Sequence, residues 1–307
     1  MSLGFSILKK LKPKTTNSFG GQRRMKLKIL GSGGGEGFPS SFCNCVRCEN
    51  ARKKGGKSLR SLSQVLINND LLIDFPLDTD AHCQAYGVKL GDIENIIITH
   101  AHTDHFMPLS FGNRGGSGAN SFKYEKVYFY GPENLEKKYD EILSSCHSQC
   151  PTRENICFVV LKNQQELQIS DYTITAIVAN HAPELGKENS LNYIIESKGK
   201  RLLYLLDSGY PTEDTLLYLE QRKQVFDCVV MDATMGFVAD NGYPYHMSFY
   251  EDKKLKDVLL SRGIANKNTK FIVTHITHNH AETHDKVEEF FMGTDIIVAY
   301  DGYQIDI

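Results

Sequence analysis

The stretch T-H-A-H-T-D-H at residues 99–105 places three histidines and one aspartate directly after an apolar run. Imidazole nitrogens and carboxylate oxygens are ligands for divalent metal ions. On an extended strand His100 and His102 point to the same side, and a following turn brings Asp104 and His105 round to a second position. Burying so many ionisable groups requires compensating charge, which two divalent cations supply. The spacing therefore predicts a site for two metal ions.

The elements that must position these residues are short strands with helices between them. Twelve strand-like runs are expected at 26–30, 64–67, 71–73, 95–99, 126–130, 157–161, 172–178, 191–195, 201–206, 226–231, 271–274 and 296–299. Helices are expected at 132–145, 211–222, 248–261 and 281–291. Grouped early strands followed by regular helices favour two sheets packed face to face with helices outside over an open doubly wound sheet.

Composition and charge narrow the class of protein. The 307 residues are 23% charged and 41% apolar, and their net charge is −2, so no overall field attracts the chain to nucleic acid or anionic membrane. No apolar stretch is long enough to cross a bilayer or to form a secretory signal, so we expect a cytoplasmic protein. One domain is expected over 25–307, after a basic tail at 1–24 that is disordered or not wholly native.

A glycine-rich stretch follows the first expected strand. Residues 31–37 read G-S-G-G-G-E-G, which has some similarity to a dinucleotide fingerprint. That motif needs a helix starting at its last glycine, whereas Phe38-Pro39-Ser40 follows here. We therefore interpret the stretch as a turn that lets the backbone pass close to a neighbouring site.

The order H-x-H-x-D-H after an apolar strand resembles the signature of the metallo-β-lactamase fold superfamily. In that superfamily an earlier strand ends in an aspartate that orients the ligand loop, and Asp74 takes this place. Later strands end in a histidine, in an aspartate that bridges both metals and in a last histidine, as His181, Asp207 and His275 do here. The resemblance spans residues 25–307 and implies a four-layer αββα sandwich of the α/β (α+β) class.

The same resemblance implies the ligand set. Two divalent cations, zinc or manganese, are expected, with a metal-bound hydroxide as nucleophile. The first metal is expected on His100, His102 and His181, and the second on Asp104, His105 and His275, with Asp207 shared.

A cysteine cluster narrows the family further. Cys43, Cys45 and Cys48 offer three thiolates, and in a chain without an export signal such a cluster favours metal over disulfides. A tetrahedral structural zinc needs a fourth ligand, for which His278 is the candidate because it follows His275 by three residues. This combination resembles the PhnP-like phosphodiesterase branch, which is related to RNase Z and PqqB. Three free thiols in a loop are the alternative.

A further pair resembles the phosphodiesterase branch that includes RNase Z. The sequence M-D-A-T at 231–234 is similar to the H-E-A-T motif of that branch, in which an acidic residue orients a histidine that protonates the leaving alkoxide. By this resemblance Asp232 orients His246 as general acid, a role that suits imidazole. Aspartate is shorter than the glutamate of the family, and the alternative is that His246 caps the helix beginning near Ser248.

The function expected from these residues is a dinuclear metal-dependent hydrolase, most simply a phosphodiesterase acting on a small or cyclic phosphodiester. A PqqB-like cofactor-biosynthesis protein, or a thioesterase or lactamase on the same fold, is the alternative. The 25 residues between His181 and Asp207 leave no room for the long tRNA-gripping arm of bacterial RNase Z, so a nucleic-acid partner is not expected. No membrane partner is expected, and a homodimer is left open.

The other histidines receive simpler interpretations. His82 and His147 lie in segments that read as solvated, and His280 and His284 flank the start of the last expected helix. Surface or capping roles are expected for all four.

Overall fold

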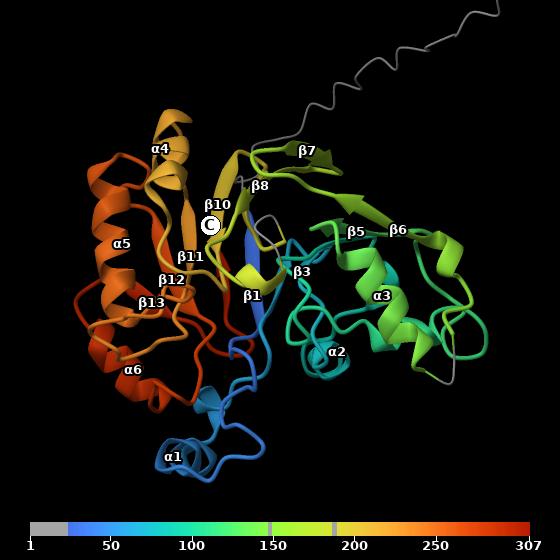
Figure 1. The fold of residues 1–307 in the computed structure, drawn as a ribbon, viewed down its shortest axis with the longest axis horizontal. Helices are drawn as coiled ribbons and strands as arrows, with labels where there is room; N and C mark the ends of the chain where they lie inside the picture. The colour runs from blue at the N-terminus through green and yellow to red at the C-terminus, as the bar shows by residue number, and fades with distance from the viewer. Residues whose placement is uncertain (1–23, 147–148, 186–188) are drawn as a thin grey trace, which may run out of the picture.

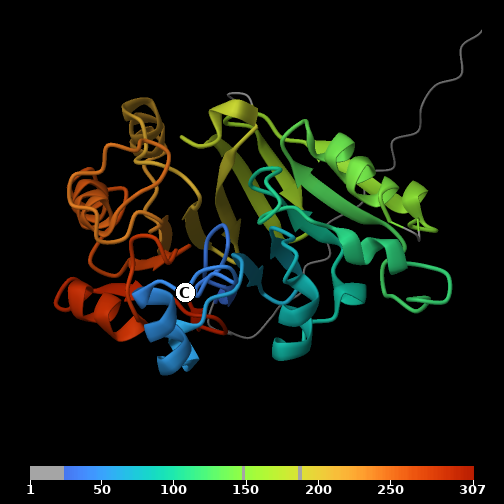
Figure 2. The ribbon, with the colours of Figure 1, turned by 60° about the horizontal axis from the view of Figure 1, so that its bottom comes forward.

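The computed structural model of the chain describes residues 24–146, 149–185 and 189–307. In these ranges two β-sheets form the middle of the molecule and helices cover their outer faces (Figure 1, Figure 2). The predicted αββα sandwich is therefore confirmed. The basic tail expected at 1–24 lies, except for Arg24, outside the described residues.

The first sheet has seven strands, and three of its six strand pairings are antiparallel and three are parallel. In spatial order they are β14 (Gln304–Asp306), β1 (Lys26–Gly31), β2 (Gln64–Ile67), β3 (Leu71–Ile73), β4 (Asn95–Ile97), β5 (Val127–Gly131) and β6 (Ile156–Val160). The parallel half runs from β3 to β6, so the carboxyl ends of these strands meet at one edge of the sheet.

The second sheet also has seven strands, with three parallel and three antiparallel pairings. Its strands are, in order, β13 (Ile296–Val298), β12 (Lys270–Thr274), β11 (Cys228–Asp232), β10 (Lys200–Leu205), β9 (Leu191–Ser197), β8 (Tyr172–Val178) and β7 (Glu166–Ile169). The strands from β10 to β13 are parallel, and the other neighbours are antiparallel.

Both faces of the central strands are buried, which explains why they read as continuous apolar runs. In and just after β10, Leu202, Tyr204 and Leu206 pack into the core between the two sheets. Leu203 and Leu205 alternate with them and face the helices on the outer side. Because side chains alternate between the two faces of a strand, this one strand contributes to two separate cores.

Helices cover the two outer faces. Those on the second sheet bring Leu216, Leu255 and Val287 into its outer core, and Tyr139 belongs to the outer core of the first sheet. The helices are α1 (Val46–Lys54), α2 (Thr79–Tyr86), α3 (Leu135–Ser144), α4 (Glu213–Gln221), α5 (Phe249–Ser261) and α6 (His284–Phe291). In Figure 1, α4, α5 and α6 lie on one side and α2 and α3 on the other, while α1 projects below the sheets. No helix in the described ranges is long and apolar enough to span a membrane.

The sequence did not predict α1, α2, β7 or β14. The α1 segment V-R-C-E-N-A-R-K-K buries only Cys48 and Ala51, so it has almost no apolar periodicity. β7 and β14 are edge strands of four and three residues that are partly exposed. Weak burial leaves a weak pattern, and these elements are held mainly by backbone pairing with β8 and β1.

The strand before the histidine motif ends earlier than predicted. β4 stops at Ile97, whereas the apolar run predicted a strand to Thr99. The buried carboxylate of Asp74 accepts hydrogen bonds from the Thr99 backbone N–H at 2.7 Å and from its hydroxyl at 2.9 Å. These bonds replace the ladder at the Thr99 N–H, and beyond it only an isolated bridge pairs His100 with Ser190 among the described residues. The expectation that His100 and His102 lie on an extended strand was therefore wrong, and the motif lies on a loop.

Candidate dinuclear metal centre

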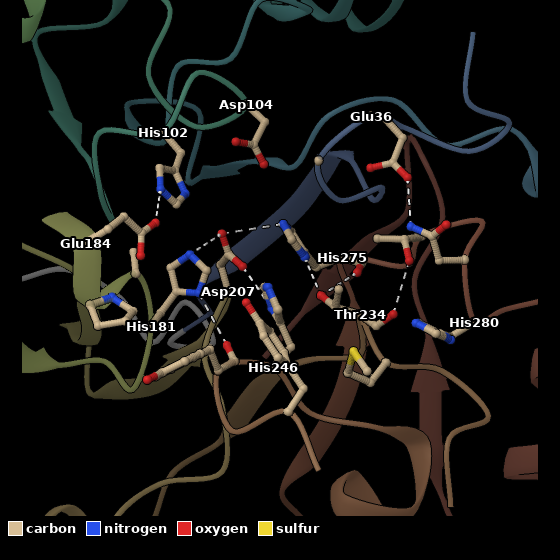
Figure 3. A pocket seen from close by; sticks show the side chains of 18 residues that line it. Glu36, His102, Asp104, His181, Glu184, Asp207, Thr234, His246, His275 and His280 are labelled. Atoms are coloured by element: carbon tan, nitrogen blue, oxygen red, sulfur yellow. Dashed lines mark hydrogen bonds and ion pairs between the residues drawn. The ribbon is translucent and has the colours of Figure 1, made fainter. Parts of the chain in front are cut away.

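The predicted ligands gather where strands of both sheets end. β3, β10 and β12 are followed within two residues by Asp74, Asp207 and His275, and the backbone of each of these residues has a positive φ, of 64°, 49° and 63°. This left-handed conformation turns the chain sharply after the strand. Side chains from distant parts of the sequence thereby meet above one edge of the sandwich (Figure 3).

One cluster contains His100, His102, His181 and Asp207, whose ligand atoms all lie within 4.8 Å of one another. Asp207 Oδ2 lies 3.2 Å from His100 Nε2 and 3.4 Å from His181 Nε2. His102 Nδ1 lies 2.9 Å from His100 Nε2. The structure thus brings together the residues predicted for the first metal.

A second cluster contains Asp104, His105, His275 and again Asp207. His105 Nε2 lies 3.0 Å from Asp207 Oδ2 and 3.2 Å from His275 Nε2. Asp104 is 3.3 Å from His105 Nε2. Asp207 therefore belongs to both clusters, in the position predicted for a bridging carboxylate, and Figure 3 shows it between His181 and His275.

These donors fit divalent cations. Burial and the neighbouring His105 hold the pKa of His100 well below its usual range, so its imidazole is a neutral ligand. Burial opposes ionisation of Asp207, yet the surrounding histidines keep the pKa of its carboxyl well below the usual range. His181 Nε2 is buried without a hydrogen-bond partner among the described residues. A buried lone pair of this kind is what a metal ion satisfies.

One threonine and two carboxylates hold two of these histidines in place. Asp74 Oδ2 accepts the His105 Nδ1 proton at 2.8 Å, which leaves Nε2 facing Asp207. The Thr234 hydroxyl contacts His275 Nδ1 at 2.7 Å and donates to Asp232 Oδ2 at 3.0 Å. Sequence reasoning missed the threonine, although its position two residues after a strand-ending aspartate was a usable signal.

The predicted acid pair also comes together. His246 Nδ1 lies 3.3 Å from Asp232 Oδ2 and 3.1 Å from Asp207 Oδ1. Burial lowers the pKa of His246, but Asp232 and Asp207 outweigh it and raise the pKa to about 11. Ser248 and Glu251 form the capping box of α5, so His246 is not the helix cap.

A cavity of about 370 Å³ opens beside these clusters. Its wall includes two acidic residues that the sequence did not single out, Glu36 and Glu184. Glu184 Oε1 lies 2.9 Å from His102 Nε2. The glycine-rich stretch lies beside the clusters as expected: a Cβ on Gly34 would stand 2.7 Å from the His275 ring, so only glycine fits there.

The cysteine cluster lies apart from this cavity, at the start of α1. Cys43, Cys45, Cys48 and His278 place their ligand atoms within 4.8 Å of one another, and Cys45 Sγ is 3.9 Å from His278 Nδ1. The Cys48 backbone N–H and His278 lower the pKa of Cys45 to about 6, whereas burial raises the pKa of Cys48 to about 11. Glu36 Oε1 accepts from His278 Nε2 at 2.6 Å, so the other ring nitrogen is directed at the thiols.

Comparison with known proteins places this geometry in a family. A family model described as a β-lactamase superfamily domain matches residues 72–276, about two thirds of the chain. The chain belongs to the β-lactamase superfamily. Family membership and the histidine and aspartate clusters together indicate a metal-dependent hydrolase. No curated protein sequence matches this superfamily member.

Several solved structures share the fold of this β-lactamase superfamily chain. A diphosphatase from the PhnP family is 20% identical, with a TM-score of 0.68 over 92% of this chain and 97% of its own. Zinc-bound PqqB from Methylobacterium extorquens is 16% identical, with a TM-score of 0.66 over 92% and 100%. The short form of human tRNase Z is 16% identical, with a TM-score of 0.60 over 91% and 98%. These three likenesses, at 16–20% identity, show a shared fold.

The structure contradicts the surface or capping roles predicted for two histidines of this protein. His82 and His284 are both 3% exposed. His82 Nδ1 bonds Gln64 at 2.7 Å, and His284 Nδ1 bonds Arg60 at 2.9 Å. Neither the solvated reading of the His82 segment nor the helix-start position of His284 indicated burial, because the buried partners are distant in sequence. His280 lines the cavity, and His147 lies outside the described residues.

Proposed function

We propose that the protein is a dinuclear metal-dependent phosphodiesterase that acts on a small or cyclic phosphodiester. The observation that carries this proposal is the position of His246, which contacts both Asp232 and the shared carboxylate Asp207 at the cavity wall. A thiolate leaves without a proton, so a thioesterase has no evident use for such a pair, whereas an alkoxide leaving group needs a proton.

The residues proposed to hold two cations, zinc or manganese, are those of the two clusters: His100, His102, Asp104, His105, His181, Asp207 and His275. Such cations supply an activated water and stabilise the charge on the phosphoryl oxygens. A third cation, a structural zinc, is proposed on Cys43, Cys45, Cys48 and His278.

The chain's own groups perform the remaining tasks. Asp232 is fully buried and fixes the ring of His246 through Nδ1, so Nε2 is the atom that delivers the proton to the leaving oxygen. Asp232 itself is held by the Thr234 hydroxyl and by the backbone N–H groups of Thr234 and Met247. The cavity of about 370 Å³ admits a small ester, which supports a small-molecule substrate.

The test combines metal analysis with turnover of bis(p-nitrophenyl) phosphate by wild type, Asp207→Ala and His246→Ala. We expect turnover by wild type that is abolished in Asp207→Ala. Because p-nitrophenolate leaves without a proton, the loss in His246→Ala should be small for this ester and about 10²-fold or more for a phosphodiester with an alkoxide leaving group. Bound metal without cleavage of any phosphodiester would reject this proposal and favour a thioester or lactam substrate on the same scaffold.

A further inference from the structure

A second cavity of about 470 Å³ lies beside the first, at the start of α4. The two cavities share His181, Pro183 and Tyr245 as walls. Since His181 belongs to the first metal cluster and lines both cavities, the second cavity borders the position proposed for the phosphate. A molecule bound at the first cavity can therefore extend into the second.

The lining of the second cavity is polar but carries little charge. Among the described residues that form it, amide and hydroxyl side chains predominate, and no lysine or arginine is present. The carboxylate there is Asp214, an exposed residue in the first turn of α4. A second phosphate group has no cation to meet among these side chains and faces a like charge.

Asn192 in β9 is the distinctive residue of this lining. It is 4% exposed, and its Oδ1 atom is buried without a hydrogen-bond partner among the described residues. Two other amides of the same cavity are satisfied internally, since Asn180 donates to Pro244 O at 2.8 Å and Asn163 accepts from Val178 N at 3.0 Å. A buried carbonyl oxygen without a donor is unfavourable unless a ligand supplies one.

We propose that the second cavity binds one of the two organic groups that are esterified to the phosphate of the substrate. This organic group is uncharged and donates a hydrogen bond to Asn192. The inference rests on the proposed phosphodiesterase function and adds the chemical class of the substrate: a phosphodiester with a neutral, hydroxylated organic group and without a second phosphate. Asn192 is a specificity-determining residue, and Asp214 excludes anionic groups.

The experiment compares two chromogenic esters on metal-loaded enzyme. In thymidine 5′-p-nitrophenyl phosphate the second organic group is neutral and hydroxylated. In methyl p-nitrophenyl phosphate it is a methyl group, which has no hydrogen-bond donor. In Asn192→Leu we expect kcat/KM for the thymidine ester to fall about tenfold, the effect of one hydrogen bond, while the methyl ester is unaffected. Equal changes for both esters, or no change, would overturn the assignment.

A second variant avoids the risk that Asn192→Leu fails to fold. Asp214 is exposed, so Asp214→Lys leaves the core intact. Wild type is expected to discriminate against thymidine 3′-phosphate 5′-p-nitrophenyl phosphate, and Asp214→Lys to raise kcat/KM for this ester roughly threefold to tenfold. The absence of any gain would contradict the role of Asp214.

Failure of the proposed function is distinguishable from failure of this inference. If wild type cleaves none of these esters, the phosphodiesterase proposal is rejected. Calorimetric titration with thymidine, which contains no phosphate, then tests the cavity by itself. Binding to wild type that weakens about tenfold in Asn192→Leu supports the subsite, and equal or absent binding rejects it.

Discussion

The two candidate metal sites of this protein share one segment but are built in opposite ways. His275 and His278 are three residues apart, yet the first faces the dinuclear clusters and the second faces the cysteines. The dinuclear clusters have a buried centre, with His105 fully buried and Asp207 3% exposed, and a more exposed rim at His102. In the cysteine cluster, Cys43 and Cys45 are half-buried on a loop.

The difference shows what fixes each site before any ion binds. The dinuclear ligands follow strands of both sheets, and carboxylates or threonines orient their rings. The cysteine ligands come from a loop, from the start of α1 and from the segment after β12. Among the described residues, no pairing between named strands joins these three segments. We therefore expect the sheets to preorganise the first site, whereas the ion itself contributes to the order of the second.

The largest expected effect is the loss of the shared carboxylate. Asp207→Ala removes a ligand from both clusters, so turnover should fall by at least about 10³-fold. Metal analysis should show depletion of the dinuclear site with zinc retained at the cysteines. Asp240→Ala, at an exposed aspartate, is the matched control. Loss of the cysteine-bound zinc in Asp207→Ala would show that the two sites are not independent.

The reciprocal variant is Cys45→Ser. It should remove one zinc per chain and lower stability by about 2–3 kcal/mol at zinc concentrations near a hundred times Kd. In a chain of this size that corresponds to roughly 3–5 °C in Tm by calorimetry. Turnover at low temperature should change little. Cys157→Ser, in β6, controls for the loss of a thiol. An unchanged zinc content would reject the cysteine site.

A smaller effect is expected from the buried threonine that orients His275. Thr234→Val removes the hydroxyl between His275 and Asp232 without changing the side-chain shape. Affinity for the dinuclear metals, measured by chelator competition, should fall roughly 10–100-fold. Thr234→Ser keeps the hydroxyl, so its affinity for the metals should be close to that of wild type. If serine and valine behave alike, packing rather than hydrogen bonding is responsible.

The smallest effect is expected at the corresponding position of the cysteine site. Glu36 orients His278 as Thr234 orients His275, but its side chain is 39% exposed. Glu36→Gln should weaken zinc at the cysteines by about tenfold, the lower end of such effects, because water shares the contact. Glu133→Gln, also exposed, should have no effect. A loss of zinc affinity as large as the loss caused by Thr234→Val would mean that the solvent exposure of the orienting residue does not determine how much it contributes to metal binding.

The sequence could predict the dinuclear residues because each follows an apolar strand, and the strand pattern is strong where both faces are buried. Asp74, His181, Asp207 and His275 were placed by resemblance, and the structure brings them together as described. The partners of these residues were harder to predict. Glu36 and Glu184 reach the cavity from a loop and a short 3₁₀ turn, whose conformations no periodicity encodes.

Edge elements and buried polar contacts show the same limit. β14 and α1 lack apolar repeats because they bury little, and they depend on neighbours that are far away in sequence. The burial of His284 follows from its contact with Arg60, 224 residues earlier. Such contacts are specified by the complete fold, so a local pattern does not contain them.

The left-handed backbone of Asp207 and His275 has a consequence for anyone who evolves this protein in the laboratory. Each non-glycine residue in that conformation costs about 1 kcal/mol of folding free energy that glycine would recover. Selection for heat resistance alone, in the absence of metal, therefore favours glycine at the positions that chemistry needs most. A programme that aims at a hardier enzyme must select for turnover in every round, or it will obtain a stable protein without a reaction.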